Sequence, residues 1–246
     1  MLMGKKFIQN KEWGVIMEKP VIVALDFADD FECINFLNQF PKDSNLYLKI
    51  GLEMFCQFGY PFVKSLRERG YNIFLDLKLH DIPNTVRRTC QMISKWDVQM
   101  LTIHASGGAE MIAAAKEGLE GSSTKLLAVT QLTSLGQVEL ANELQVPLKS
   151  QDYVTRLAKL AFNNGADGVI SSALEVPMIK EATNEDFLCI TPGIRPKSAQ
   201  VGDQKRVATP AQARSLGSDG IVVGRPITQA ENGYQAYLNI SKEWNK

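Results

Sequence analysis

Eight short apolar runs with helical patterns between them are the feature that most constrains the fold of this chain. The runs are nearly continuous in Val, Ile and Leu, which predicts parallel strands covered on both faces, because a half-exposed strand alternates apolar with polar residues. The runs are Val21–Leu25, Leu46–Ile50, Ile73–Leu79, Met100–Ile103, Leu126–Thr130, Gly168–Ile170, Leu188–Ile190 and Ile221–Val223. Helical patterns between them include Phe31–Gln39, Thr85–Lys95, Ala109–Gly118, Tyr153–Asn163 and Pro210–Leu216. This alternation predicts a parallel α/β fold.

The number of units decides between two parallel architectures. Eight units within 246 residues predict a single (β/α)8 TIM barrel over residues 20–246, with Met1–Lys19 as an extension outside the fold. An open doubly wound sheet is the alternative, but it would carry a glycine-rich fingerprint after its first strand, where this chain has none. Thr133–Lys149 and Pro192–Thr209 are longer than a connection needs. In a barrel both follow a strand, on the face where active-site loops gather.

Composition argues against several classes of function. Lys and Arg number 27, as do Asp and Glu, so the zero net charge provides no overall field to draw the protein to nucleic acid or to an anionic membrane. Charged residues interrupt the N-terminal apolar residues, so we expect neither a signal peptide nor a membrane span. The four cysteines (Cys33, Cys56, Cys90 and Cys189) lie far apart, which argues against disulfides and structural zinc. We expect buried, reduced thiols and a cytoplasmic protein.

The segment Ile73–Thr85 carries charges where a barrel strand should be apolar. Asp76 and Lys78 are two residues apart, so both side chains should face the barrel interior while the leucines around them face the helices. Asp81 follows where the strand should end. A buried ion pair kept for packing is the alternative, but such pairs are weak evidence of stability and are unusual at this end of a strand. We therefore predict a functional cluster at the barrel mouth.

Two more charged residues end the neighbouring strands. Asp26 closes the first strand, and Lys49 lies near the end of the second. With Asp76, Lys78 and Asp81 they make an alternating set of carboxylates and ammonium groups. A Schiff-base lysine has to lose its proton, whereas a lysine between carboxylates stays charged. The pattern predicts that Lys78 acts as a fixed positive charge and a proton donor.

Glycine and arginine follow the last two strands. Gly193 and Arg195 come after the seventh strand, and Gly224 and Arg225 come directly after the eighth. In barrels of this kind these loops often hold a phosphate, because glycine lets backbone N–H groups approach an anion and arginine offers a bidentate fork. The pattern predicts a monophosphate ester as ligand. Ordinary turn glycines with surface arginines are the alternative.

Together these motifs resemble those of the orotidine 5'-phosphate decarboxylase family, from Val21 to near Tyr237. The resemblance rests on four runs, Asp76–Thr85, Val129–Ser134, Thr191–Pro196 and Val223–Pro226. The spacing Asp-x-Lys-x-x-Asp alone also occurs in relatives that handle sugar phosphates. The full run Asp-Leu-Lys-Leu-His-Asp-Ile-Pro-Asn-Thr, followed by the other three, is much more specific.

The resemblance implies that the protein converts orotidine 5'-monophosphate to UMP and CO2, the last step of de novo pyrimidine nucleotide synthesis, with no metal and no organic cofactor. Lys78 would stabilise the carbanion at C6 and protonate it. Asp76 would lie beside the substrate carboxylate, and Lys49 would orient the charged set. Asp81 would reach into the site of a partner subunit, which implies a homodimer.

The same resemblance implies the substrate-binding residues. Asp26 and Lys49 would hold the ribose hydroxyls, Thr133 would lie at the pyrimidine edge, and Pro192 would belong to the same site. Ile82 and Thr85 would cross into the partner's site together with Asp81. The phosphate would be held by Arg195, Gln204, Gly224 and Arg225.

Two rival functions remain open at this point. A metal-dependent sugar-phosphate decarboxylase or aldolase has the same barrel, but such relatives tend to place a carboxylate where this chain has Lys49, whose charge would repel Mg²⁺. A catalytically silent nucleotide-binding protein is the other rival. His104 and His80, near the predicted mouth, are expected to be structural rather than to act as acids or bases.

Overall fold

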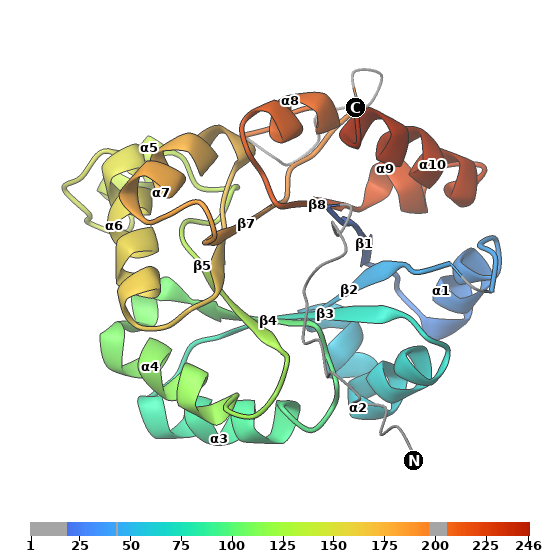
Figure 1. The fold of residues 1–246 in the computed structure, drawn as a ribbon, viewed down its shortest axis with the longest axis horizontal. Coiled ribbons are helices and arrows are strands. Elements are labelled where there is room, and N and C mark those ends of the chain that lie inside the picture. The colour runs from blue at the N-terminus through green and yellow to red at the C-terminus, as the bar shows by residue number, and fades with distance from the viewer. Residues whose placement is uncertain (1–18, 43, 197–205) are drawn as a thin grey trace, which may run out of the picture.

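A closed barrel of eight parallel strands forms the centre of the molecule in the computed structural model, which describes residues 19–42, 44–196 and 206–246 (Figure 1). The strands are β1 (Val21–Leu25), β2 (Tyr47–Gly51), β3 (Asn72–Leu79), β4 (Met100–His104), β5 (Lys125–Val129), β6 (Gly168–Ile170), β7 (Leu188–Thr191) and β8 (Gly220–Val223). Each strand pairs with the next, and β8 closes on β1. The structure confirms the predicted TIM barrel, and each predicted strand agrees with an observed one to within one residue at either end. Of the predicted extension Met1–Lys19, only Lys19 is among the described residues.

Helices surround the barrel (Figure 1). They are α1 (Asp30–Leu37), α2 (Leu52–Glu68), α3 (Pro83–Ile93), α4 (Ala109–Gly118), α5 (Gln137–Asn142), α6 (Ser150–Asn163), α7 (Val176–Ala182), α8 (Pro210–Ser215), α9 (Arg225–Thr228) and α10 (Gly233–Trp244). No range was predicted for α2, in which Gly59 has φ 60° and Pro61 follows, so the helical pattern is interrupted. The stretch Thr133–Lys149, expected as a loop, contains α5.

Two apolar layers hold the barrel together, because alternate residues of each strand face opposite ways. The smaller layer fills the barrel interior with Ile22, Ala24, Phe74, Met100, Leu127, Ile190 and Val222. The larger layer packs the outer face of the strands against the helices, and it includes Leu75, Leu101 and Ile103. Burying one such side chain stabilises the fold by about 1.5–3 kcal/mol. The interior layer fills the barrel beneath the charged residues at its mouth.

Ion pairs and hydrogen bonds connect neighbouring segments at the other end of the barrel, where the strands begin. The Asp219 carboxylate accepts a hydrogen bond from the Cys189 backbone at 2.9 Å and pairs with Lys180 at 2.8 Å and with Lys19 at 3.5 Å. Asp167 similarly accepts from the Leu126 backbone at 2.9 Å. These contacts stabilise the fold at the end opposite the mouth.

The cysteines differ from the prediction at one position. Cys33, Cys90 and Cys189 are buried, and burial raises the pKa of each thiol to about 12. Cys56 is exposed on α2, so the prediction that it is buried was wrong. It lies on the solvent side of a helix for which no range was predicted. Within the described ranges, no helix combines the length and the apolar character needed to cross a bilayer.

Candidate active site

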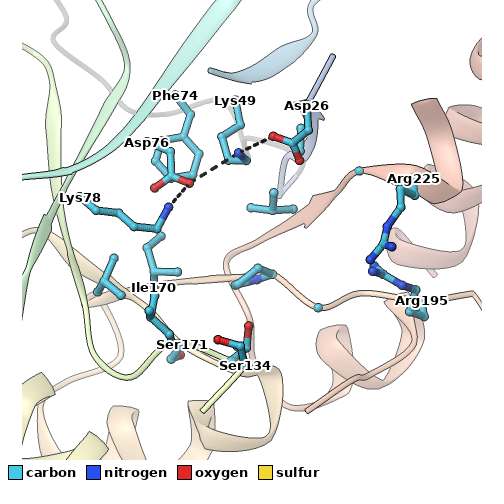
Figure 2. A pocket seen from close by; sticks show the side chains of 18 of the residues that line it. Asp26, Lys49, Phe74, Asp76, Lys78, Ser134, Ile170, Ser171, Arg195 and Arg225 are labelled. Atoms are coloured by element: carbon cyan, nitrogen blue, oxygen red, sulfur yellow. Dashed lines mark hydrogen bonds and ion pairs between the residues drawn. The ribbon is translucent and has the colours of Figure 1, made fainter. Parts of the chain in front are cut away.

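A cavity of about 570 Å³ lies at the mouth of the barrel (Figure 2). Its volume is within the range of small-molecule sites. Ten of the residues singled out from the sequence line it, namely Asp26, Lys49, Asp76, Lys78, Thr133, Pro192, Gly193, Arg195, Gly224 and Arg225. They come from six of the eight strands or the loops that follow them, so closure of the barrel brings them together.

Charges of alternating sign run along one side of this cavity, across β1, β2 and β3 (Figure 2). The ammonium nitrogen of Lys49 lies 3.2 Å from Oδ1 of Asp26 and 3.6 Å from Oδ2 of Asp76. Lys78 Nζ lies 2.8 Å from the same Asp76 oxygen. The predicted alternation therefore exists as a continuous chain of ion pairs. A substrate in the cavity would meet fixed charges of both signs.

Asp76 is the most buried member of this chain, with its side chain 10% exposed. Burial by itself would raise the pKa of its carboxyl group, but the ammonium groups of Lys49 and Lys78 and hydrogen bonds from Lys78 and Thr102 outweigh burial. The pKa of Asp76 is therefore lowered. Asp76 is ionised at neutral pH, although it lies largely out of water.

The backbone of β3 is irregular where it presents Lys78. Lys78 has φ 51°, in the left-handed region that side chains other than glycine seldom adopt. The register of β3 against β4 shifts between Leu75 and Leu79. Such a conformation costs on the order of 1–3 kcal/mol and persists only where surrounding contacts hold it. Strain at a residue that lines a cavity points to a functional position.

Two arginines face the cavity from the side opposite Lys78. Arg195 follows β7 and Arg225 follows β8, and Figure 2 shows their side chains extending toward each other. Gly193, at φ 76°, lets the chain turn beneath Arg195. Gly224 lies against β1, where an added Cβ would be 3.5 Å from Ala24 and 3.7 Å from Asp26. The arrangement places two cationic side chains, and glycine backbone that carries no side chain, at the position where an anionic group would bind.

Four of the predicted site residues are not among the residues that line the cavity. Asp81, Ile82 and Thr85 are exposed beyond the end of β3, and the Asp81 carboxylate accepts a hydrogen bond from the Ile82 backbone at 2.6 Å. Gln204 falls outside the described residues. A single chain therefore does not bring Asp81 to the cavity that holds Lys78.

Several lining residues were not singled out from the sequence. Phe74 and Ile170 form apolar walls, and Gln131, Ser134 and Ser171 add polar groups. Ser171 directly follows β6 and Gln131 lies two residues past the end of β5, which is a signal that would have found them. Phe74 and Ile170 carried no such signal, because apolar residues are expected in a barrel strand.

Arg206 joins two of the loops at the mouth. Its guanidinium pairs with Glu175 and donates to the backbone carbonyls of Gln131 at 3.2 Å and Leu132 at 3.1 Å. Burial lowers the pKa of Arg206. These contacts hold the segment before α8 against the loop after β5 and against Glu175, which follows β6. They thereby help to shape the cavity.

His104 at the end of β4 lies beside His80, with 5.4 Å between ring centroids. Burial lowers the pKa of His104, and His80 and Lys78 lower it further, while Asp76 acts in the opposite direction. His104 is therefore largely uncharged at neutral pH and adds no third cation beside Lys78. Neither histidine lines the cavity, and the structural role expected for both stays a prediction.

Comparison with known proteins places this geometry in one family. The model of the orotidine 5'-phosphate decarboxylase / HUMPS family matches residues 19–240. Curated relatives named orotidine 5'-phosphate decarboxylase include those of Streptococcus suis, 50% identical over 229 residues, and Streptococcus agalactiae, 50% identical over 232 residues. These alignments cover 93% and 94% of this chain and 99% of each relative.

Solved structures agree with the sequence comparison. The crystal structure of orotidine 5'-phosphate decarboxylase from Lactobacillus acidophilus has a TM-score of 0.83 and 44% identity, and the match covers 92% of this chain and 99% of that one. An uncharacterised conserved protein from Geobacillus kaustophilus matches with a TM-score of 0.81 and 38% identity, over 92% of this chain and 100% of that one. With a family model that spans nearly the whole barrel and relatives that are identical at half of their aligned positions, the chain belongs to the orotidine 5'-phosphate decarboxylase / HUMPS family and is an enzyme of the carboxy-lyase class.

Proposed function

We propose that the protein decarboxylates orotidine 5'-monophosphate to UMP and CO2 with no metal and no organic cofactor. The observation that carries this proposal is the chain of charges Asp26, Lys49, Asp76 and Lys78 on one side of the cavity, opposite Arg195 and Arg225 on the other. A nucleoside monophosphate has the matching polarity, with a 5'-phosphate at one end and a reactive ring at the other. Family membership supports the same substrate.

Lys78 performs the central step in this proposal. Loss of CO2 leaves an electron pair at C6, in the plane of the ring, where the ring π system does not delocalise it. A fixed ammonium group stabilises this charge and then donates a proton to C6, which yields UMP, and solvent restores the proton to Lys78. At ~4 Å and an effective dielectric constant near 20, the attraction is about 4 kcal/mol. This corresponds to roughly three powers of ten in rate, which is too little alone.

Binding of the remote groups supplies further stabilisation. Arg195, Gly224 and Arg225, together with Gln204, hold the phosphate. Asp26 and Lys49 hold the ribose hydroxyls, Thr133 lies at the pyrimidine edge, and Pro192 forms part of the wall. Binding energy from these contacts forces the substrate carboxylate toward the ionised Asp76, which repels it until CO2 leaves. The lowered pKa of Asp76 supports this role, because a protonated carboxyl group would not repel.

The proposal includes a homodimer with shared sites. Asp81 is exposed beyond β3, and Ile82 is 67% exposed despite its apolar side chain. In a two-fold dimer these residues and Thr85 reach the partner's cavity, where Asp81 completes the charged set around the partner subunit's substrate. We further propose a cytoplasmic enzyme whose catalytic domain spans residues 20–246 and carries Met1–Lys19 as an extension.

Decarboxylation by the purified protein tests the proposal. After treatment with excess EDTA, the protein should still remove the absorbance of orotidine 5'-monophosphate and release one CO2 per UMP formed, and Lys78→Ala prepared in parallel controls for contaminating enzyme. Among the described residues no group of three or more His, Cys, Asp or Glu side chains is placed to hold a metal ion. Activity that EDTA abolishes and Mg²⁺ restores would instead favour the metal-dependent rival. UMP binding without CO2 release would favour the silent nucleotide-binding protein.

A further inference from the structure

Thr102 lies in the middle of β4 with its side chain in the barrel interior. It is completely buried and does not line the cavity. Its strand neighbours Leu101 and Ile103 pack in the outer apolar layer, so the hydroxyl group of Thr102 is a polar group in an otherwise apolar strand. A buried hydroxyl is costly unless it is hydrogen-bonded.

The hydroxyl group of Thr102 faces the irregular part of β3. Leu75 pairs with Leu101 and Leu79 pairs with Ile103, so three residues of β3 lie opposite Thr102 alone. The Lys78 backbone N–H, displaced from the regular ladder, donates to Oγ1 of Thr102 at 2.9 Å. The threonine side chain thus supplies the acceptor that a strand carbonyl would otherwise provide.

The same hydroxyl group donates to the catalytic carboxylate. Thr102 Oγ1 lies 2.9 Å from Oδ1 of Asp76, while Oδ2 of Asp76 is 2.8 Å from Lys78 Nζ. Chemistry fixes both directions, because a backbone N–H only donates and an ionised carboxylate only accepts. A closed ring of contacts results, from the Lys78 backbone through Thr102 and Asp76 back to the Lys78 ammonium group.

We propose that Thr102 is a positioning residue for the decarboxylation, whose hydroxyl group holds the Lys78 backbone in its left-handed conformation and fixes the rotation of the Asp76 carboxylate. The inference rests on the proposed function. Without the hydroxyl group, Lys78 returns toward regular strand geometry and its ammonium group moves away from the reacting carbon. Small displacements of a catalytic group have large effects on rate.

Three variants separate positioning from packing. Thr102→Val keeps the branched shape and removes the hydroxyl group, whereas Thr102→Ser keeps the hydroxyl group and removes a methyl group. Thr124→Val is the matched control, since Thr124 is 5% exposed and its hydroxyl group donates to the Val98 carbonyl at 2.8 Å. That bond is also buried but contacts neither Asp76 nor Lys78.

We expect Thr102→Val to lower kcat by roughly 10- to 100-fold, with KM and the Kd of UMP within about threefold of wild type. Thr102→Ser should restore most of kcat, and Thr124→Val should leave kcat unchanged. The acid limb of the kcat profile should also move to higher pH in Thr102→Val, because Asp76 loses a donor that lowers its pKa. Lys49 and Lys78 face Asp76 in all these variants, and the neighbouring His104 and Asp26 are unchanged.

The inference is overturned if Thr102→Val has wild-type kcat, or if Thr102→Ser is impaired as strongly as Thr102→Val, which would indicate packing alone. If Thr102→Val does not fold, Thr102→Cys takes its place, because a thiol is a weak hydrogen-bonding group. The wild-type assay keeps the two proposals apart. A wild-type protein that binds UMP without releasing CO2 overturns the proposed function, whereas an active wild type with an equally active Thr102→Val overturns only the role of Thr102.

Discussion

The ammonium nitrogen of Lys78 lies 2.8 Å from Oδ2 of Asp76, although only one residue separates the two along β3. Both side chains face the barrel interior, and the left-handed backbone at Lys78 accompanies this close approach. The pair therefore combines opposite charges with a conformation that a regular strand would not adopt.

Removal of the Lys78 ammonium group should abolish turnover without abolishing nucleotide binding. We expect Lys78→Ala to lower kcat by at least about three powers of ten. This is the rate factor that corresponds to the attraction between one ammonium group and the carbanion. Steady-state kinetics gives kcat, and calorimetry with UMP checks that the site still binds. Lys64→Ala is the control, because Lys64 is exposed on α2 in a surface pair with Glu68. A Lys78→Ala variant with near-normal kcat would contradict the mechanism.

Neutralising Asp76 tests whether repulsion of the substrate carboxylate contributes to the rate. Asp76→Asn keeps the shape of the side chain and removes its charge, so kcat should fall by more than about tenfold while the Kd of UMP, which has no carboxylate, does not weaken. Comparing kcat with UMP affinity separates this effect from loss of the site. Turnover within about threefold of wild type would remove the catalytic role of Asp76.

The lowered pKa of Asp76 also predicts how stability depends on pH. In the unfolded chain an aspartate has a pKa near 3.9, so the ionised Asp76 stabilises the fold above that pH, and this contribution is lost as the pH falls through the lower folded-state pKa. The stability of wild type relative to Asp76→Asn should therefore decline as the pH falls below about 5, and should go on declining as the pH falls through the folded-state pKa.

Urea unfolding followed by circular dichroism at each pH measures this difference. Asp152→Asn, at an exposed position of α6, provides a reference substitution that should show no comparable trend. An advantage of wild type that grew toward acid pH would have the wrong sign for a carboxyl group with a lowered pKa.

The arginines opposite Lys78 should contribute to binding more than to the chemical step at saturation. We expect Arg225→Ala to raise KM by roughly 10- to 100-fold, because a hydrogen bond to a charged group contributes about 1.5–3 kcal/mol. Binding of uridine, which has no phosphate, should be unchanged, and Arg156→Ala on the exposed face of α6 should behave as wild type. Equal weakening of UMP and uridine would show that Arg225 does not hold the phosphate.

Shared sites predict complementation between two inactive variants. Asp81→Asn and Lys78→Ala should each be nearly inactive, but a dimer with one subunit of each kind contains one site with an intact Lys78 and the partner's intact Asp81. After the mixed subunits are denatured and refolded together, activity should reach about a quarter of the wild-type value, since half of the dimers are mixed and each has one intact site. Refolding each variant alone gives the baseline. A mixture no more active than its components would place Asp81 in its own subunit's site or outside any site.

The strands and the charged set were predictable because they depend on short-range patterns. Continuous apolar runs identified the eight strands, and charged residues at their ends identified Asp26, Lys49, Asp76 and Lys78. No range was predicted for α2, whose helical pattern is interrupted at Gly59 and Pro61. Pattern alone also has no means of placing Asp81, whose proposed contribution depends on a second chain.

Thr102 and the bulge beside it show a second limit. A threonine in an apolar strand is common, so its type carried no signal. Its position two residues before His104 puts it on the interior face, but the hydrogen bonds to Asp76 and Lys78 depend on a register shift between two strands. Such shifts are set by tertiary contacts and leave little trace in local sequence.

The closure of β8 on β1 places Gly224 against Asp26, near opposite ends of the chain. The cavity consequently does not form in part, because Asp26 and Gly224 meet only when all eight strands have closed into the barrel. During biosynthesis the emerging polypeptide would remain inert until the eighth strand had left the ribosome and docked. Recovered enzymatic turnover after dilution from denaturant would therefore report the last event of barrel assembly rather than the appearance of secondary structure.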